Sequence, residues 1–128
     1  MINQFSYKVL LVDNCDFFHN SVKGNIFFGF DLTFVTNGEL AVKKLENEIF
    51  HAVIFKVDMS DMSGLVLAEK IRRLNLLNKH IIIVGVIATP SLILKKAFDS
   101  GINKLFSWPI EIPEIPAYLK NSLSHLGY

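Results

Sequence analysis

The chain alternates between short, solidly apolar runs and longer segments in which apolar and polar residues follow a helical spacing. Strands covered by helices on both faces read as continuous apolar runs, whereas strands with one exposed face alternate. The apolar runs therefore predict buried strands of a parallel sheet. They are Lys8–Val12, Leu32–Val35, Ala52–Phe55, Ile81–Val86 and Lys104–Ser107.

The segments between and after these runs predict helices. In the first segment, apolar residues from Phe17 to Ile26 recur close to the i, i+4 spacing of one helix face. A glycine, which commonly ends a helix, follows the first and the fourth segments. Pro113 and Pro116 leave the start of the last helix open by a few residues. The predicted helices are Asp16–Phe28, Glu39–Glu48, Leu65–Leu74, Pro90–Ser100 and Pro113–Leu126.

Five repeats of strand and helix predict a single doubly wound α/β domain over residues 1–128. Right-handed crossovers place helices on both faces of such a sheet. The functional site of this architecture lies at the carboxyl ends of the strands. The residues that follow the strands are therefore the candidates for chemistry, among them Asp13, Asn14, Lys56, Asp58 and Trp108.

The composition is apolar for a small domain. Hydrophobic residues make up 51% of the chain, eleven residues are Phe, and the mean hydropathy is +0.37. Either a partner covers part of the surface or Phe fills a normal core, and both interpretations stay open. The formal net charge of +1 provides no field that would attract nucleic acid or an acidic membrane.

Several classes of site have no signal in the sequence. The single cysteine, Cys15, excludes an internal disulfide and is typical of a reducing cytoplasm. The apolar run Ile81–Ala88 is too short to cross a bilayer, and no signal peptide is expected at the N-terminus. No histidine spacing predicts a metal site, and no glycine-rich loop predicts a nucleotide. We therefore expect no catalytic residues, no cofactor and no metal.

Four motifs at the predicted strand ends carry a family resemblance. They are VLLVDN (Val9–Asn14), AVIFKVDMSDMSG (Ala52–Gly64), Ser100-Gly101 and Trp108–Ile110. In this order and spacing the chain resembles the receiver domains of two-component response regulators (CheY-like). The resemblance implies a flavodoxin-like strand order of 2-1-3-4-5. It also implies a phosphorylation pocket in which carboxylates hold Mg²⁺ and an aspartate accepts the phosphoryl group.

The acidic side of this pocket is altered. Asp13 matches the first of two acidic positions that hold the metal, but Asn14 replaces the second. Lys56 matches the position of the acceptor aspartate, and an ammonium group cannot form an acyl phosphate. Asp58 lies two residues further on, where the family uses a backbone carbonyl group. The loop Met59–Gly64 fixes this alignment without a gap.

The residues that would respond to phosphorylation are altered as well. Val86 matches the hydroxyl residue that contacts the phosphoryl group, and Trp108 matches the lysine that neutralises its charge. Leu105 matches the aromatic switch position. A shift of three residues would bring Thr89 to the place of Val86, but the Ser100-Gly101 anchor disfavours it. Together these replacements predict a pseudo-receiver that lacks the acceptor aspartate.

Asp13 and Lys56 should lie side by side, because the strands that they follow are neighbours in this fold. We hypothesise that they form an ion pair in which the ammonium group stands in for Mg²⁺. Asp58 is the second candidate partner, and the alternative is a Lys56 side chain that extends into solvent. A reactive Schiff-base lysine is disfavoured, because a neighbouring carboxylate raises the pKa of lysine. The isomer of the Trp108-Pro109 bond, cis or trans, stays open.

The leading functional hypothesis is a protein-interaction module in two-component-type signalling, without phosphorylation. The resemblance implies a contact face on the fourth helix, the fifth strand and the fifth helix, and a partner that is a signalling protein or a second copy. One alternative is a phosphorelay domain that uses Asp13 or Asp58 with weakly bound Mg²⁺. Another is a domain that binds a small molecule in the altered pocket. The candidate contact residues are Leu92, Lys95, Lys96, Asp99, Lys104, Phe106, Trp108, Glu111 and Tyr118.

Overall fold

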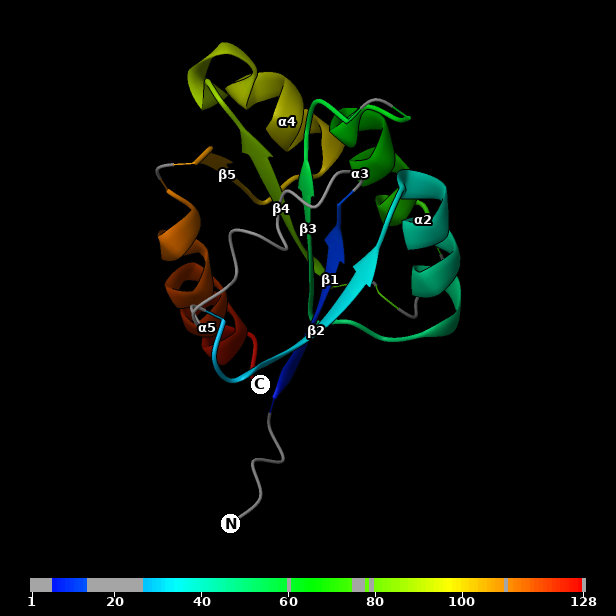
Figure 1. Cartoon of the computed structure of the whole chain (residues 1–128), viewed down its shortest axis with the longest axis vertical. Helices are drawn as coiled ribbons and strands as arrows, with labels where there is room; N and C mark the ends of the chain where they lie inside the picture. The colour runs from blue at the N-terminus through cyan, green and yellow to red at the C-terminus, as the bar shows by residue number, and fades with distance from the viewer. Residues whose placement is uncertain are drawn as a thin grey trace.

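The computed structural model describes residues 6–13, 27–59, 61–74, 78, 80–109 and 111–127 of the chain. These residues form a five-stranded parallel sheet in the order β2-β1-β3-β4-β5 (Figure 1). The predicted doubly wound α/β fold of flavodoxin-like strand order is thereby confirmed. The strands are β1 (Tyr7–Val12), β2 (Phe30–Val35), β3 (Ala52–Lys56), β4 (Ile82–Ile87) and β5 (Lys104–Ser107).

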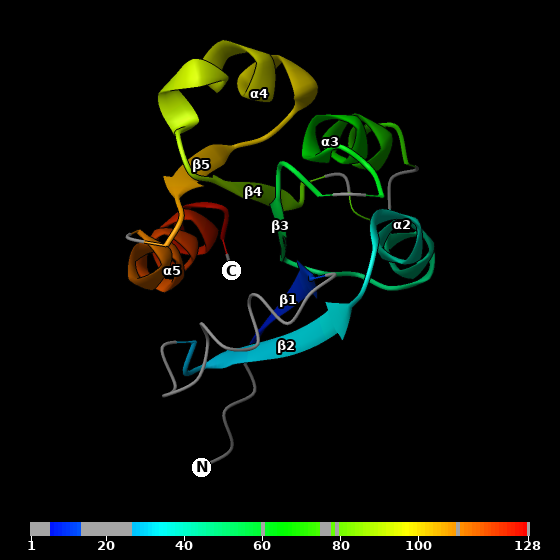
Figure 2. The same ribbon diagram turned by 45° about the horizontal axis from the view of Figure 1, so that its top comes forward.

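Helices cover both faces of the sheet. Three of them, α2, α3 and α4, lie on one face, and α5 lies on the other (Figure 2). The predicted helix Asp16–Phe28 lies outside the described residues except for its last two positions. The described helices are α2 (Gly38–Asn47), α3 (Gly64–Arg72), α4 (Leu94–Ser100) and α5 (Ile115–His125).

The sheet separates two hydrophobic cores. The α2–α4 core lies between the sheet and α2, α3 and α4, and the α5 core lies between the sheet and α5. Successive side chains of a strand point to opposite faces, so Ile54 enters the α5 core and Phe55 enters the α2–α4 core. Both side chains are fully buried. This arrangement explains why the strands are apolar at every position.

Side chains cap the first turns of α2 and α3. The Asn37 side-chain oxygen accepts a hydrogen bond of 2.9 Å from the Leu40 backbone N–H. The Ser63 hydroxyl oxygen accepts one of 3.1 Å from the Leu65 N–H. Such caps satisfy backbone donors that the helix itself leaves unpaired, which fixes where these two helices begin.

The predicted helix Pro90–Ser100 is wrong at its start. Pro90–Leu92 form a 3₁₀ turn, and α4 begins only at Leu94. Between them, Ile93 has a φ of −128°, which is outside the helical range, and no side chain caps either start. Pro90 is therefore placed in a first turn, as predicted, but the turn does not continue into α4.

The last helix and the preceding loop also resolve open points of the sequence. Ile112–Glu114 form a 3₁₀ turn, and α5 starts two residues later than the predicted Pro113, at Ile115. The Trp108-Pro109 peptide bond is cis. No helix among the described residues is both long and apolar enough to cross a membrane.

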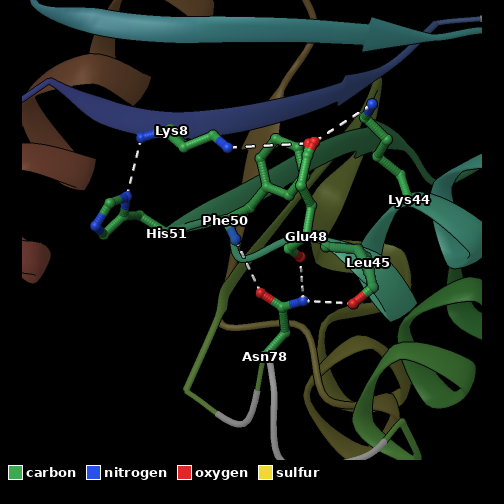
Figure 3. A network of polar contacts seen from close by, with 7 residues as sticks. All are labelled: Lys8, Lys44, Leu45, Glu48, Phe50, His51 and Asn78. Atoms are coloured by element: carbon green, nitrogen blue, oxygen red, sulfur yellow. Dashed lines mark hydrogen bonds and ion pairs between the residues drawn. The ribbon is translucent and has the colours of Figure 1, made fainter.

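A polar network ties the end of α2 to the amino-terminal edge of the sheet (Figure 3). The backbone N–H of Lys8 donates to Nδ1 of His51 at 2.9 Å, and the His51 N–H donates back to the Lys8 carbonyl at 2.8 Å. The Lys8 ammonium lies 3.9 Å from a carboxylate oxygen of Glu48, which also pairs with Lys44 at 3.3 Å. These contacts join β1 to the segment between α2 and β3.

The stability of the domain is expected to fall as the pH drops below about 6.5. Burial, and secondarily the charge of Lys8, lower the pKa of His51 in the folded chain. The unfolded chain then binds a proton more readily, and protonation of Nδ1 would oppose the Lys8 N–H. The contribution of neutral His51 to the free energy of unfolding is complete above the ordinary histidine pKa and is lost as the pH falls below it. The free energy of unfolding should change by less than about 1.4 kcal/mol per pH unit.

Urea unfolding between pH 5 and pH 8 measures this dependence. His51→Gln should flatten the curve, because the variant has no ring to protonate. His80→Gln changes an exposed histidine and serves as the matched control, so it should leave the slope unchanged. An equal pH dependence in the His51→Gln variant and the parent chain would contradict the assignment.

Candidate functional site

The strand register brings three predicted site residues to one edge of the sheet. Lys56, the last residue of β3, is paired with Val86 of β4. On the other side of β3, Phe55 is paired with Val12 of β1, so the next position, Asp13, comes beside Lys56. The carboxyl ends of β1, β3 and β4 therefore carry Asp13, Lys56 and Val86 in neighbouring positions.

These side chains also belong to the same face of the sheet. Leu11, Ile54 and Val84, each two residues earlier in its strand, all belong to the α5 core. Because side chains return to the same face every second residue, Asp13, Lys56 and Val86 continue this face at the strand ends. The sequence-based prediction that they adjoin one another agrees with this geometry, while the ion pair between Asp13 and Lys56 stays a prediction.

The two charged residues differ in burial. Asp13 is only 5% exposed, and its backbone N–H donates to the Val35 carbonyl at 2.9 Å. Lys56 is partly buried, and Asp58 is exposed in the loop that follows β3. A buried carboxylate requires a compensating charge or hydrogen bonds. Asn14, the other acidic-site position, lies outside the described residues.

Apolar residues lie at the carboxyl ends of β4 and β5, on the other side of Lys56 from Asp13. Val86 is fully buried in the α5 core, and Trp108 packs against the same core. The backbone N–H of Trp108 donates to the Ile87 carbonyl at 3.0 Å, which extends the contact of β4 with β5 beyond the last paired residues. Thr89 lies beyond the end of β4 and is exposed, so the register keeps Val86 and not Thr89 beside Lys56.

Leu105, at the predicted switch position, points to the opposite face. It is 6% exposed and belongs to the α2–α4 core. The absence of a side chain at Gly85 makes room for it, since a Cβ there would lie 2.9 Å from a Leu105 methyl carbon and 3.0 Å from a Val57 methyl carbon. Leu105 is therefore a packed core residue between β5 and the neighbouring strand.

The loop after β3 is held tightly against the sheet. The Val57 N–H donates to the Val86 carbonyl at 3.0 Å, and the Gly64 N–H donates to the Val57 carbonyl at 2.7 Å. The Asp61 carboxylate accepts a 3.0 Å hydrogen bond from the Gly38 N–H at the start of α2. Sequence reasoning missed this contact, because Asp61 lies 23 residues away from Gly38 along the chain and no local pattern joins the two.

The described residues at this edge do not by themselves supply the ligands that a Mg²⁺ ion requires. Mg²⁺ requires oxygen ligands in near-octahedral order, usually including carboxylates. The described residues supply the carboxylate of Asp13, while the ammonium of Lys56 offers no lone pair and repels a cation. Within the described ranges, no group of three or more His, Cys, Asp or Glu residues could hold a metal ion.

The predicted contact face is partly exposed and partly core. Phe106 is a correction, because it is only 4% exposed and packs edge-on against Tyr118 in the α5 core, with ring centroids 5.6 Å apart. Glu111 is half-buried and accepts a 2.6 Å hydrogen bond from the Ser107 N–H. Trp108 and Tyr118 are likewise half-buried, whereas the remaining candidates Leu92, Lys95, Lys96, Asp99 and Lys104 are exposed.

Sequence reasoning overlooked two apolar residues on this face. Phe98 and Leu94 of α4 are 49% and 44% exposed, and they lie one helical turn apart. Leu92, just before α4, is 79% exposed. The signal was present as an i, i+4 pair of large apolar residues beside lysines, but it was indistinguishable from a core-facing pair.

The strand order, with helices on both faces of the sheet, is the fold of CheY-like domains. The profile of the response regulator receiver domain family matches residues 9–120. The chain belongs to this family. It is a receiver domain of two-component signalling, and no curated protein sequence matches it.

Solved receiver structures share the fold. A response regulator receiver domain protein (CheY-like) from Methanospirillum hungatei is 22% identical, with a TM-score of 0.80, and the match covers 94% of this chain and 96% of that one. A two-component response regulator from Clostridium difficile is 23% identical, with a TM-score of 0.79 over 96% and 100% of the two chains. The receiver domain of a sensor histidine kinase from Pseudomonas aeruginosa, with magnesium coordinated in its active site cleft, is 18% identical, with a TM-score of 0.76 over 91% and 97%.

Proposed function

We propose that this receiver domain works without phosphorylation, as a protein-interaction module of a cytoplasmic two-component-type system. The observation that carries the proposal is the identity of the residue at the end of β3. Lys56 ends this strand, next to Val86 of β4 and beside Asp13 after β1. In the family this is the place of the acceptor aspartate. An amine at this place cannot form the acyl phosphate on which receiver signalling depends.

The other groups of the pocket support the same function. A transferred phosphoryl group needs cations and hydrogen-bond donors aimed at its oxygens. Val86 offers a methyl surface where the family has a hydroxyl, and Trp108 offers a ring where the family has an ammonium group. Restoring one residue would leave the other two unsuited to phosphoryl transfer.

In this proposal the Lys56 ammonium replaces the metal. Asp13 is buried at the end of the neighbouring strand, so its carboxylate needs a compensating charge or hydrogen bonds. A lysine from β3 supplies that charge permanently, whereas Mg²⁺ would supply it reversibly. The pocket is then stable without a ligand, and the domain has one signalling state at this edge.

The proposed output surface is the exposed part of α4 with the segment before it. Leu92, Leu94 and Phe98 provide exposed apolar area, and Lys95 and Lys96 flank it. Lys95 is already paired with Asp99 at 2.9 Å, which leaves Lys96 as the more available charge of the two. A partner with an apolar patch and a peripheral carboxylate fits this surface. Leu105 packs beneath it and has no aromatic ring that could respond to phosphorylation.

Titration with Mg²⁺ and beryllofluoride tests the proposal, with Trp108 as the reporter because it is the only tryptophan. We expect no saturable change in fluorescence and no phosphoryl adduct in the intact mass after incubation with acetyl phosphate. Saturable quenching, or an adduct that maps to Asp13 or Asp58, would contradict the proposal and establish a phosphorelay function.

Lys56→Asp is the matched variant in the same titration. It restores a carboxylate to the pocket and removes the competing charge, so weak Mg²⁺ binding with a dissociation constant of about 1 mM or higher is expected. Phosphorylation is expected to stay below detection, because Val86 and Trp108 still cannot stabilise the phosphoryl group. Efficient phosphorylation of this variant would show that Lys56 alone blocks an otherwise complete site.

A further inference from the structure

The outer edge of β2 is an unprotected edge strand. β2 is at one end of the sheet, and no strand of the described residues pairs with its outer side (Figure 2). All six of its residues are at least partly exposed, although four of them are large and apolar. Edge strands are normally short, or protected by lysine, proline or a bulge. β2 has a regular register with β1 and includes none of these features.

The opposite edge of the sheet is protected in the usual way. β5 has only four residues, begins with Lys104, and buries Leu105 and Phe106 in the two cores. The two edges therefore differ in their capacity to accept another strand. The six-residue length and single charge of β2, Asp31, leave it open to pairing.

A groove lies on the α2 side of this edge, at the carboxyl end of β2. It has a volume of about 330 Å³ and lies between Val35 of β2 and one side of α2. Leu40, which is 43% exposed, and Lys43 line its wall. Val35 packs against the α2–α4 core, so Thr33 and Asp31, two and four residues earlier, point to the same side of the strand.

Two charges at this edge are complementary but separated in a single copy. Asp31 and Lys43 have no ion-pair partner within the part of the chain that the structure describes. Asp31 is near the start of β2, while Lys43 lines the groove beside Val35 at its end. Four residues of extended strand separate Asp31 from Val35 by about 13 Å, so Asp31 lies near the opposite end of β2 from the groove.

We propose that the outer edge of β2 pairs antiparallel with the same strand of a second copy, centred on Thr33. A two-fold axis through Thr33 places Asp31 of each copy opposite Val35 of the other, at the groove that Lys43 lines. The Val35 carbonyl points to β1, where it accepts from Asp13, so the Leu32 peptide groups point outward to the partner. Both copies keep α2 on the same face of one continuous sheet.

Other registers fit less well. A centre at Asp31 would place the two Asp31 carboxylates opposite each other, which is destabilising. A slip of one strand by one residue against the other would pair side chains that belong to opposite faces. Centres at Leu32 or Phe34 keep the faces matched, but they place Asp31 opposite Thr33 or Asn37 and not opposite Val35. Only the register centred on Thr33 brings Asp31 to Val35 and the Lys43 groove. This surface is on the sheet edge opposite β5, so the inference does not depend on the proposed function.

Sedimentation of the chain from about 10 µM to about 1 mM tests the proposal, since a two-strand contact is a small interface. The mass should rise with concentration from 14.5 kDa toward twice that value. Thr33→Lys and Thr33→Glu should each weaken association at least tenfold, because identical charges meet at the two-fold axis. An equimolar mixture of the two variants should associate again.

A second pair of variants tests the charge contact. Asp31→Lys and Lys43→Glu, both at exposed positions, should each weaken the dimer, and the double variant should recover it. Phe98→Lys changes the exposed face of α4 and should leave the dimer intact. Far-UV circular dichroism confirms that each variant is folded.

Three results would overturn the proposal. The first is a chain that stays monomeric over the whole concentration range. The second is a dimer that persists in Thr33→Lys and Thr33→Glu, or a mixture of these variants that does not associate. The third is loss of the dimer in Phe98→Lys, which would assign association to α4 and not to β2.

Discussion

Gly64→Ala is expected to lower the free energy of unfolding by about 3 kcal/mol. Gly64 begins α3, where a Cβ would lie 2.6 Å from the Val57 Cα and 3.1 Å from the Lys56 carbonyl oxygen. Both atoms belong to the backbone, so a new methyl group must displace either α3 or the end of β3. Chemical denaturation followed by Trp108 fluorescence measures the loss.

Gly38→Ala is the matched control. Gly38 occupies the first position of α2, as Gly64 does in α3. A Cβ at Gly38 would meet the Met62 sulfur at 3.0 Å, and this flexible side chain can move away. The substitution should therefore change stability by less than about 1 kcal/mol, with the helix preference of alanine offsetting part of the cost. Equal effects of the two substitutions would contradict the close approach of α3 to β3.

The close approach at Gly64 matters for the site as well as for stability. The Gly64 N–H donates a hydrogen bond to the Val57 carbonyl, and the Val57 N–H donates one to the Val86 carbonyl. These two bonds fix the chain immediately after Lys56 between β4 and α3. A shifted loop would change the position of Lys56, so the Mg²⁺ titration of a Gly64→Ala, Lys56→Asp double variant would differ from that of Lys56→Asp alone.

The sheet could be predicted because its buried strands have a simple sequence pattern. A strand covered on both faces is apolar throughout, and five such runs separated by amphipathic segments leave few arrangements other than a doubly wound sheet. The gapless spacing of the motifs puts Lys56 and Val86 in the same pocket, and the β3–β4 register pairs these two residues. The strand ends were therefore placed correctly to within one or two residues.

Side-chain direction was harder to predict than strand position. The family resemblance places Phe106 on the contact face because this residue belongs to the fifth strand, but α5 covers the side to which it points. Phe98 was overlooked because a phenylalanine in a helix normally faces the core, whereas Ala97 takes that place in α4. Both errors arise because the sequence does not show which flank of a helix the sheet leaves open.

The predicted ion pair of Asp13 with Lys56 can be derived from the sequence only in part. The backbone positions of both residues follow from strand order and register, and sequence reasoning reaches them. The final contact depends on four side-chain torsions of lysine and on how far Asp13 can be dehydrated. The entropy lost by the lysine side chain and the dehydration of Asp13 oppose the attraction between the two charges. The sum is within a few kcal/mol of zero, and no sequence pattern shows its sign.

Asn78 shows the limit of sequence reasoning most clearly, because its partners are far away along the chain. Its side-chain oxygen accepts from the Phe50 N–H at 2.9 Å. Its side-chain nitrogen donates to the Leu45 carbonyl at 2.6 Å and to the Glu48 carbonyl at 2.9 Å (Figure 3). One buried amide, 6% exposed, thus satisfies three peptide groups where α2 ends and the chain turns toward β3. No local pattern marks this role.

Asn78→Ala is therefore expected to cost about 3 kcal/mol, because it leaves one N–H and two carbonyl groups without their partner. The loss should be measured by urea unfolding beside two controls. Asn47→Ala removes a single exposed hydrogen bond to the Lys43 carbonyl, so it should cost less than about 0.5 kcal/mol. Asn78→Asp keeps the acceptor for Phe50 but points a carboxylate oxygen at two carbonyl oxygens, so it should not recover the stability. A cost below about 1 kcal/mol for Asn78→Ala would mean that water replaces the amide and that the end of α2 is held by its other contacts.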